Sequence, residues 1–264
     1  MDAPCRGRGF RSTAAVPRSA RGVGDFAYVG SELDLFAQAV TWKSYFRSQL
    51  LPYLQGDVLE VGAGIGANAR LLCGPTQQRW LCLEPDRTLA ARIEAEGGLP
   101  PMCEVIAGTI EDLPADARFD AILYLDVLEH IEDDRKELTL AAAHLKTGGA
   151  LIVLAPAWQW LFTPFDQAIG HYRRYSKASL REVVPHNLSE HRVRYLDSVG
   201  LFGSLGNKLV LRAAMPSLGQ IRFWDRVLVP LSRRLDPLLG YRFGKSVLGV
   251  WRLPSYAGAT RPKG

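Results

Sequence analysis

Residues 58–68 of this 264-residue chain read VLEVGAGIGAN, an apolar run that ends on an acid and continues into three alternating glycines. The apolar run predicts a buried strand, and Glu60 lies near its end. Glycines lack the Cβ atoms that hold a ligand away from the backbone, and they tolerate positive φ angles. A helix from about Ala67 would direct its free N–H groups at a bound molecule. The stretch therefore predicts a loop that cradles a nucleotide-like ligand.

Two ligand classes compete for this loop. Residues 62–67, GAGIGA, also satisfy the loose dinucleotide fingerprint with its final Gly/Ala. Residues 79–84, RWLCLE, predict a second strand, and its terminal Glu84 suits a ribose diol in either interpretation. Glu60 discriminates between them, because a negative charge gains nothing beside a pyrophosphate. A zwitterionic ligand with an ammonium group would gain from it.

Further strands and helices alternate along the chain, which predicts a doubly wound α/β sheet, mostly parallel, with helices on both faces. A helix is expected over about 32–53, ahead of the first strand. The expected strands cover about 57–61, 79–84, 103–107, 119–125, 150–155, 191–197 and 246–251. The expected later helices cover about 67–74, 86–96, 133–146 and 177–184, with Gly148-Gly149 as the stop of the third and Ser176 as the cap of the last.

Two later motifs identify a family. Residues 125–134 read LDVLEHIEDD, residues 145–156 read LKTGGALIVLAP, and both follow the glycine loop and Glu84 in order. Together they resemble the class I S-adenosylmethionine-dependent methyltransferases over roughly residues 42–251. Residues 165–176, FDQAIGHYRRYS, resemble a bacterial subfamily with a D-x-x-x-G-H-Y-R-R-Y block after strand five. The resemblance implies a Rossmann-like sheet with an antiparallel last strand and a helical insertion before it.

The resemblance also implies a cofactor, S-adenosylmethionine, and the residues that would hold it. The glycine loop would surround its methionine and ribose portion, Glu60 would meet its ammonium group, and Glu84 would accept both ribose hydroxyls. The family usually has Gly-Asp after strand three to read the adenine amino group, where this chain has Gly108-Thr109, so Glu111 or Asp112 is the expected substitute. The full expected set is Glu60, Gly62, Ala63, Gly64, Gly66, Glu84, Pro85, Asp86, Thr109, Ile110, Leu125 and Asp126.

Methyl transfer needs a positioned acceptor and a route for its proton. His130 after strand four, and His171 with Asp166 after strand five, fall where this fold opens its cleft. Each histidine is a candidate general base near neutrality, with a packing role as the alternative. No metal ligand set is predicted.

The acceptor pocket is expected after strand five. Alternation would put Trp158, Trp160 and Phe162 on one side of an extended segment, as an apolar wall or as plain core. Arg173 and Arg174 could bind an anionic group of the acceptor beside Tyr175, or pair with Asp166 or Glu182. In the helix before strand one, Trp42 and Tyr45 either close over the cofactor or pack in the core.

Charge is concentrated at the two ends of the chain. Residues 1–25 hold five Arg against two Asp, and residues 201–264 hold eleven Lys and Arg against two Asp. Because the whole chain has a net charge of +5, residues 26–200 have a net charge of −7. The first 25 residues have few large apolar groups and are expected to be disordered. No apolar run is long enough to span a membrane. The four cysteines do not have the spacing of a metal site and are expected to be reduced. The acidic core is not accompanied by a recognised nucleic-acid-binding module.

The insertion has its own pattern. Ile221, Trp224, Leu228, Leu231 and Leu235 are expected on one stripe between residues 220 and 239, beside arginines. Such a helix fits an anionic membrane surface or, equally, a lid packed on the sheet.

The sequence thus predicts a methyltransferase for a small, largely apolar acceptor, anionic or lipid-linked, with oxygen favoured. The alternatives are an NAD(P)-dependent oxidoreductase and a non-catalytic cofactor-binding partner. We expect a cytoplasmic protein, with peripheral membrane contact left open, and the oligomeric state is not predicted. The expected units are residues 1–25, a methyltransferase core at 26–198, the insertion at 199–245 and a last strand and tail at 246–264.

Overall fold

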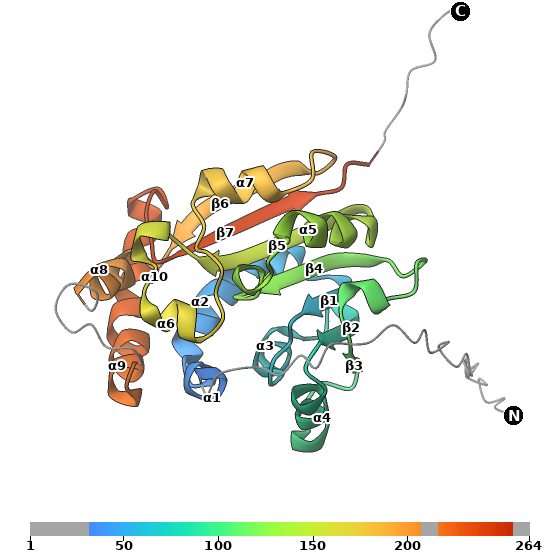
Figure 1. The fold of residues 1–264 in the computed structure, drawn as a ribbon, viewed down its shortest axis with the longest axis horizontal. Helices are drawn as coiled ribbons and strands as arrows, with labels where there is room; N and C mark the ends of the chain where they lie inside the picture. Colours follow the sequence, from blue (N-terminus) through green and yellow to red (C-terminus); the bar gives the residue numbers. More distant parts are fainter. Residues whose placement is uncertain (1–31, 207–215, 256–264) are drawn as a thin grey trace, which may run out of the picture.

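A single seven-stranded sheet, in the order β3-β2-β1-β4-β5-β7-β6, forms the centre of the protein (Figure 1). The computed structural model describes residues 32–206 and 216–255, so the expectation for residues 1–25 lies outside the described chain. The strands are β1 Gly56–Val61, β2 Gln77–Glu84, β3 Cys103–Ala107, β4 Phe119–Leu125, β5 Leu145–Pro156, β6 Ser189–Leu196 and β7 Ser246–Arg252. Only β7 pairs antiparallel with its neighbours, which confirms the predicted fold class.

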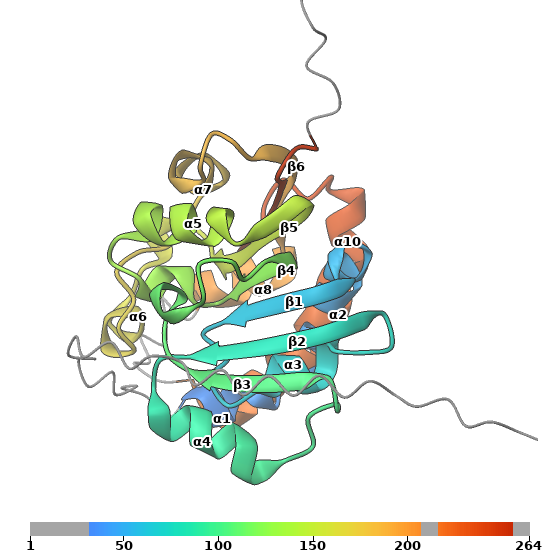
Figure 2. The same ribbon diagram turned by 90° about the vertical axis from the view of Figure 1, so that its right-hand side faces the viewer.

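Helices cover both faces of the sheet. Figure 2 shows α2, α3 and α10 on one face and α5 and α7 on the other. The α-helices are α1 Glu32–Ala37, α2 Val40–Leu50, α3 Ala67–Leu72, α4 Arg87–Glu96, α5 Asp134–Ala143, α6 Pro164–Ala168, α7 Lys177–Val183, α8 Ser198–Gly206, α9 Leu218–Phe223 and α10 Val229–Leu238. Short 3₁₀ turns lie at Leu51–Tyr53, Ile110–Asp112, Leu128–His130 and Gln159–Leu161.

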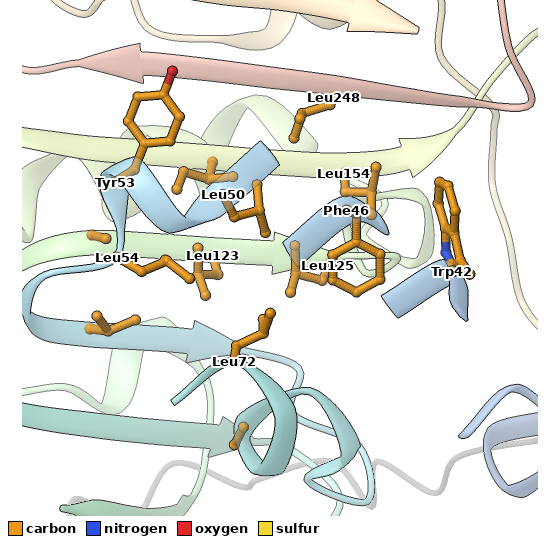
Figure 3. Close-up of a cluster of buried hydrophobic side chains, with 14 of the residues drawn as sticks. Trp42, Phe46, Leu50, Tyr53, Leu54, Leu72, Leu123, Leu125, Leu154 and Leu248 are labelled. Atoms are coloured by element: carbon orange, nitrogen blue, oxygen red, sulfur yellow. The ribbon is translucent and has the colours of Figure 1, made fainter. Parts of the chain in front are cut away.

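Helix α2 anchors one half of the core. Trp42, Tyr45, Phe46 and Leu50 recur at helical spacing and are all buried. Figure 3 shows Phe46 and Leu50 beside leucines of the sheet strands. Trp42 and Tyr45 are therefore core aromatics rather than a cover for the cofactor. The expected single helix over 32–53 is broken, because Ala39 lies at φ −78° and ψ 66° between α1 and α2.

The expected glycine stop of the helix before β5 is also wrong. Helix α5 ends at Ala143, and β5 already begins at Leu145. Gly148, at φ +80°, lies within β5, and its N–H donates to the carbonyl of Leu253. The Ser176 cap is confirmed, because its hydroxyl accepts from the Ser179 N–H.

The insertion between β6 and β7 is joined to the core by buried acids. Asp225 accepts the backbone N–H groups of Thr41 and Trp42 at the start of α2. Asp236 accepts from the Tyr45 hydroxyl and from the backbone N–H groups that open α8. Each carboxylate satisfies N–H groups that have no partner within their own helix, and it opposes the positive end of the helix dipole. The inner side of the insertion is thus a packed lid.

A π-helical turn at Trp224–Leu228 joins α9 to α10 and changes which side of the insertion is buried. The N–H of Val229 donates to the carbonyl of Trp224, five residues back, so one extra residue enters the turn. After it, the buried positions are Val229, Ser232 and Asp236, while Leu231 and Leu235 are 43% and 40% exposed. The predicted stripe was therefore wrong at its last two residues. Within the described residues, every helix is too short or too polar to span a membrane.

Candidate active site

The glycine loop follows β1 as predicted. Gly62, Gly64 and Gly66 have φ angles of +67°, +58° and +72°, a conformation that favours glycine. At Gly62, a Cβ would also lie 2.7 Å from the Val127 side chain. Leu33 of α1 lies over Gly64. The loop therefore requires glycine for its shape, because neighbouring side chains occupy or border the space that a Cβ would take.

Glu84 closes the loop from the end of β2. Its Oε2 accepts from the Gly64 N–H at 2.7 Å, and its Oε1 accepts from the Asp86 N–H at 3.0 Å. Burial raises the pKa of Glu84, and these two N–H groups oppose the rise. A carboxylate offers about four lone-pair directions, so two acceptor positions remain for a diol.

Glu60 lies under the loop and is 1% exposed. Its Oε2 accepts from the Trp80 indole N–H at 3.0 Å, whereas its Oε1 is buried without a hydrogen-bond donor among the described residues. Burial raises the pKa of Glu60 to about 7, against the lowering effect of that indole N–H. A cationic ligand group nearby would stabilise the ionised form.

Asp126 lies directly after the end of β4. Its side chain is exposed, yet the protein around it is dense enough that burial raises the pKa of the carboxyl. Its φ of 56° turns the chain sharply after the strand. Such a group, accessible but surrounded, is suited to contact a bound ligand.

Two lysines near Asp126 are not predicted from the sequence as site residues. Lys43 of α2 donates to Asn68 Oδ1 at 2.8 Å, and burial lowers its pKa against the attraction of Asp126 and Glu60. The pKa of Lys245 is lowered by burial against the attraction of Asp197, and its ammonium lies 3.9 Å from the ring centre of Trp224. Each belongs to a segment that the sequence assigns to packing, so no local signal marks it.

On the expected adenine side, Asp86 caps α4 through the Thr88 and Leu89 N–H groups. Thr109 caps the next 3₁₀ turn, and Asp112 Oδ2 accepts from both its N–H and its hydroxyl. Glu111 forms a surface ion pair with Lys136. Oδ2 of Asp112 is thus engaged in a cap. A contact between Asp112 and the adenine amino group stays a prediction, and it would use the other carboxylate oxygen, Oδ1.

Asp166 is a fully buried hub. It accepts from the Thr163 N–H and hydroxyl, from two guanidinium nitrogens of Arg174, and from His171 Nδ1 at 3.0 Å. These donors hold the pKa of Asp166 well below its usual range despite burial. With no exposed surface, Asp166 is placed to orient His171, and its predicted role in catalysis stays a prediction.

His171 and His130 lie side by side, as expected for the loops after β5 and β4. Their ring centres are 4.5 Å apart, edge to face. Because Nδ1 of His171 faces Asp166, its Nε2 carries the lone pair. Burial lowers the pKa of His130 to about 4, with a contribution from His171. His130 is therefore neutral near pH 7 and a weak base, which leaves His171 as the better candidate.

The predicted aromatic wall has a different shape. Residues Gln159–Leu161 form a 3₁₀ turn, so the alternation that would align residues 158, 160 and 162 does not exist. Trp158 stacks on Tyr195 at 4.5 Å and donates to the Gly244 carbonyl, while Trp160 is 50% exposed. Phe162 is half-buried after that turn. Trp158 is thus a packing residue.

The basic block after β5 is mostly structural. Arg173 pairs with Asp134 at 2.6 Å, and Arg174 forms the two-nitrogen contact with Asp166, the structural alternative anticipated from the sequence. Tyr175 is 1% exposed and donates to Asp134, and its expected contact with the acceptor stays a prediction. A shallow hollow does contain Trp160, Arg173 and Arg174, but none of the glycine loop, Asp126, His130 or His171.

Comparisons with known proteins agree with this geometry. Residues 59–153 match the family model described as a methyltransferase domain. A "Probable S-adenosylmethionine-dependent methyltransferase" of Mycolicibacterium smegmatis is 28% identical over 57% of this chain and 56% of its own length. A ubiquinone biosynthesis O-methyltransferase of Bradyrhizobium is 32% identical over 39% of this chain and 41% of its own. The chain thus spans about half the length of the curated relatives it matches.

Solved structures show the same fold. The N-methyltransferase NodS of Bradyrhizobium japonicum, in complex with S-adenosyl-L-homocysteine, superposes with a TM-score of 0.54 at 15% identity, over 83% of this chain and 88% of its own. Coclaurine N-methyltransferase gives 0.55 at 12% identity, over 81% and 72%. Residues 59–153 thus match a methyltransferase domain, and the whole sheet has the fold of these methyltransferase structures.

Proposed function

We propose that this protein transfers a methyl group from S-adenosylmethionine to a hydroxyl of a small, largely apolar acceptor. The observation that carries the proposal is the pairing of the open glycine loop with Glu84, which is bonded to Gly64 within that loop. Glu60 adds a negative charge near the loop, which would repel the pyrophosphate of a dinucleotide.

The residues present fit this cofactor. Glu84 has two acceptor positions for the ribose hydroxyls, and the buried Oε1 of Glu60, which lacks a donor among the described residues, favours an ammonium group near it. Lys43 is a candidate partner for the cofactor's carboxylate. It is a cation close to Asp126 and Glu60, two residues of the expected cofactor site. When bound, the cofactor supplies a methyl group on an activated sulfonium.

His171 is the proposed base for the acceptor proton. Asp166 fixes the tautomer that leaves Nε2 able to receive it. An oxygen acceptor is favoured by the similarity to O-methyltransferases of ubiquinone biosynthesis, whose name states that chemistry for those proteins alone.

The test of this function is a comparison of ligands by calorimetry. We expect the protein to bind S-adenosylmethionine and S-adenosylhomocysteine, with no heat from NAD or NADP at the same concentration. Label from methyl-tritiated S-adenosylmethionine should then pass into phenolic or polyol acceptors. Binding of NAD without S-adenosylmethionine would favour the oxidoreductase, and cofactor binding without transfer to any acceptor would favour a non-catalytic partner.

We further propose that the outer side of the insertion docks on an anionic lipid surface. Phe223, Val227, Leu231, Leu235 and Leu238 are spaced by three or four residues and are 40% to 81% exposed. Arg222, Arg226, Arg233 and Arg234 are exposed beside them. The two acids of the same segment are buried and bonded to the core, so the exposed side carries positive charge alone. Apolar side chains flanked by arginines favour the interface of an anionic bilayer.

Vesicle sedimentation tests this docking. The protein should pellet with vesicles that contain anionic phosphatidylserine, and the pelleted fraction should fall as salt rises. Replacing Arg222 and Arg226 by Gln should weaken partition roughly 30-fold, at about 1 kcal/mol per basic residue. Replacing the exposed Arg135 of α5 by Gln serves as the control. Pelleting that is absent, or insensitive to salt and to the paired variant, would leave the insertion as a lid alone.

A further inference from the structure

A compact group of three potential metal ligands lies beyond the carboxyl ends of β4 and β5. Glu129 and His130 belong to the 3₁₀ turn after β4, and His171 lies in the loop after β5. One ligand atom from each lies within 4.8 Å of the other two. Ligands at about 2.1 Å from one tetrahedral ion lie about 3.4 Å apart, so a closure of little more than an ångström would gather the group around one.

Glu129 is the unusual member of this group. It is 1% exposed, and neither of its carboxylate oxygens has a hydrogen-bond donor among the described residues. His171 Nε2 lies 3.9 Å from its Oε1, beyond hydrogen-bond distance. The field of Asp126 adds to the cost of a charge there. A buried carboxylate of this kind is destabilising unless it is protonated or meets a cation.

Both histidines are held as ligating histidines usually are. His171 Nδ1 faces the buried carboxylate of Asp166 at 3.0 Å, which directs Nε2 to the side of Glu129. His130 is oriented by the backbone carbonyls of Gly170 and Ile169. A carboxylate or carbonyl behind the second ring nitrogen fixes the tautomer and raises the basicity of the ligating one.

We propose that Glu129, His130 and His171 bind a divalent cation of the zinc and manganese type, with open coordination positions toward the cleft. One carboxylate and two imidazoles suit such ions, and three protein ligands leave room for an acceptor. Asp126 lies close enough to both Glu129 and His171 to affect their electrostatics, which puts the ion beside the expected methionine end of the cofactor.

The ion gives the acceptor a chemical class, and this part rests on the proposed methyl transfer. Two adjacent oxygens, as in a catechol or a vicinal diol, can chelate an ion with open positions. The ion lowers the pKa of the bound hydroxyl, whose proton passes to solvent water. That oxygen's electron pair forms the new O–CH₃ bond, and the pair of the broken S–CH₃ bond stays on sulfur. With His171 bound to the ion, a separate protein base is unnecessary.

Equilibrium dialysis with Zn²⁺ and Mn²⁺ alone, without cofactor, tests the site. The wild-type protein should take up one ion, and Glu129→Gln and His171→Ala should each bind at least about tenfold more weakly. Glu129→Gln removes a buried charge, so its melting temperature should not fall, and added Zn²⁺ should raise the melting temperature of the wild type only. His186→Ala, an exposed histidine elsewhere, is the matched control.

The outcomes separate this site from the proposed function. Ion uptake without S-adenosylmethionine binding would sustain the site and defeat the methyltransferase. Cofactor binding that persists in a chelator, with no saturable ion uptake by the wild type, would overturn the site alone and indicate a protonated Glu129. Uptake that is equal in Glu129→Gln and the wild type would also overturn it.

Discussion

Glu84→Ala is expected to weaken S-adenosylmethionine binding about 100-fold while the protein stays folded. The substitution removes the acceptor of both expected ribose hydroxyls, and each hydrogen bond to a charged group contributes about 1.5–3 kcal/mol. It also frees the Gly64 and Asp86 N–H groups, which loosens the loop. A loss of about 3 kcal/mol corresponds to roughly two orders of magnitude in Kd.

Calorimetry against S-adenosylhomocysteine gives the Kd, and near-ultraviolet circular dichroism shows whether the core persists. Glu104→Ala is the matched control, because Glu104 lies on the adjacent strand and its ion pair among the described residues is with Arg79 at the surface. Glu84→Gln, which keeps the size and one acceptor oxygen, should lie between the two. A Kd for Glu84→Ala within about threefold of the wild type would remove Glu84 from the cofactor site.

His171→Ala should lower kcat at least 100-fold with the cofactor Kd changed by less than about twofold. The side chain lies on the acceptor side of the cleft, and loss of a general base typically costs 10²-fold to 10⁴-fold. The measurement is transfer of tritiated methyl to the acceptor that the wild type methylates fastest, with His186→Ala as the unaffected control. A kcat within about twofold of the wild type would exclude both the base and the ligand role of His171.

The two roles of His171 differ in what restores or accompanies the loss. If His171 acts only as a base, exogenous imidazole should recover part of kcat and the ion content should not change. If it binds the ion, His171→Ala should lose the ion together with activity, and Glu129→Gln should show the same loss. Asp166→Asn, which disturbs the tautomer of His171, should lower kcat in both cases.

Most of the cofactor side was predictable because its signals are local. The glycines, Glu60 and Glu84 lie at strand ends that the apolar pattern locates, and parallel strands bring those ends to one edge. The acceptor side depends on short turns. The 3₁₀ turn at Gln159–Leu161 undid the predicted aromatic alternation, since nothing in four closely spaced aromatics distinguishes a turn from an extended segment.

The buried residues of the insertion could not be predicted fully from its apolar pattern. The sequence pattern predicts that Leu231 and Leu235 are buried. Because of the π-helical turn at Trp224–Leu228, Ser232 and Asp236 are buried instead, and the two leucines are exposed. Asp236 is tolerated inside because distant N–H groups meet it, and such partners have no trace in a local window. Lys43 escaped for the same reason, because its neighbours Asn68 and Asp126 come from other elements.

The capping of α2 by Asp225 also constrains the order in which the chain can fold. The Trp42 N–H and its acceptor are 183 residues apart, so the first turn of α2 stays incomplete until the last quarter of the chain has been made. At synthesis rates of about 5–20 residues per second, that interval is roughly 10–40 s. A nascent chain therefore leaves the Trp42 N–H without this acceptor for that time, and α2, which carries Lys43, completes its first turn late.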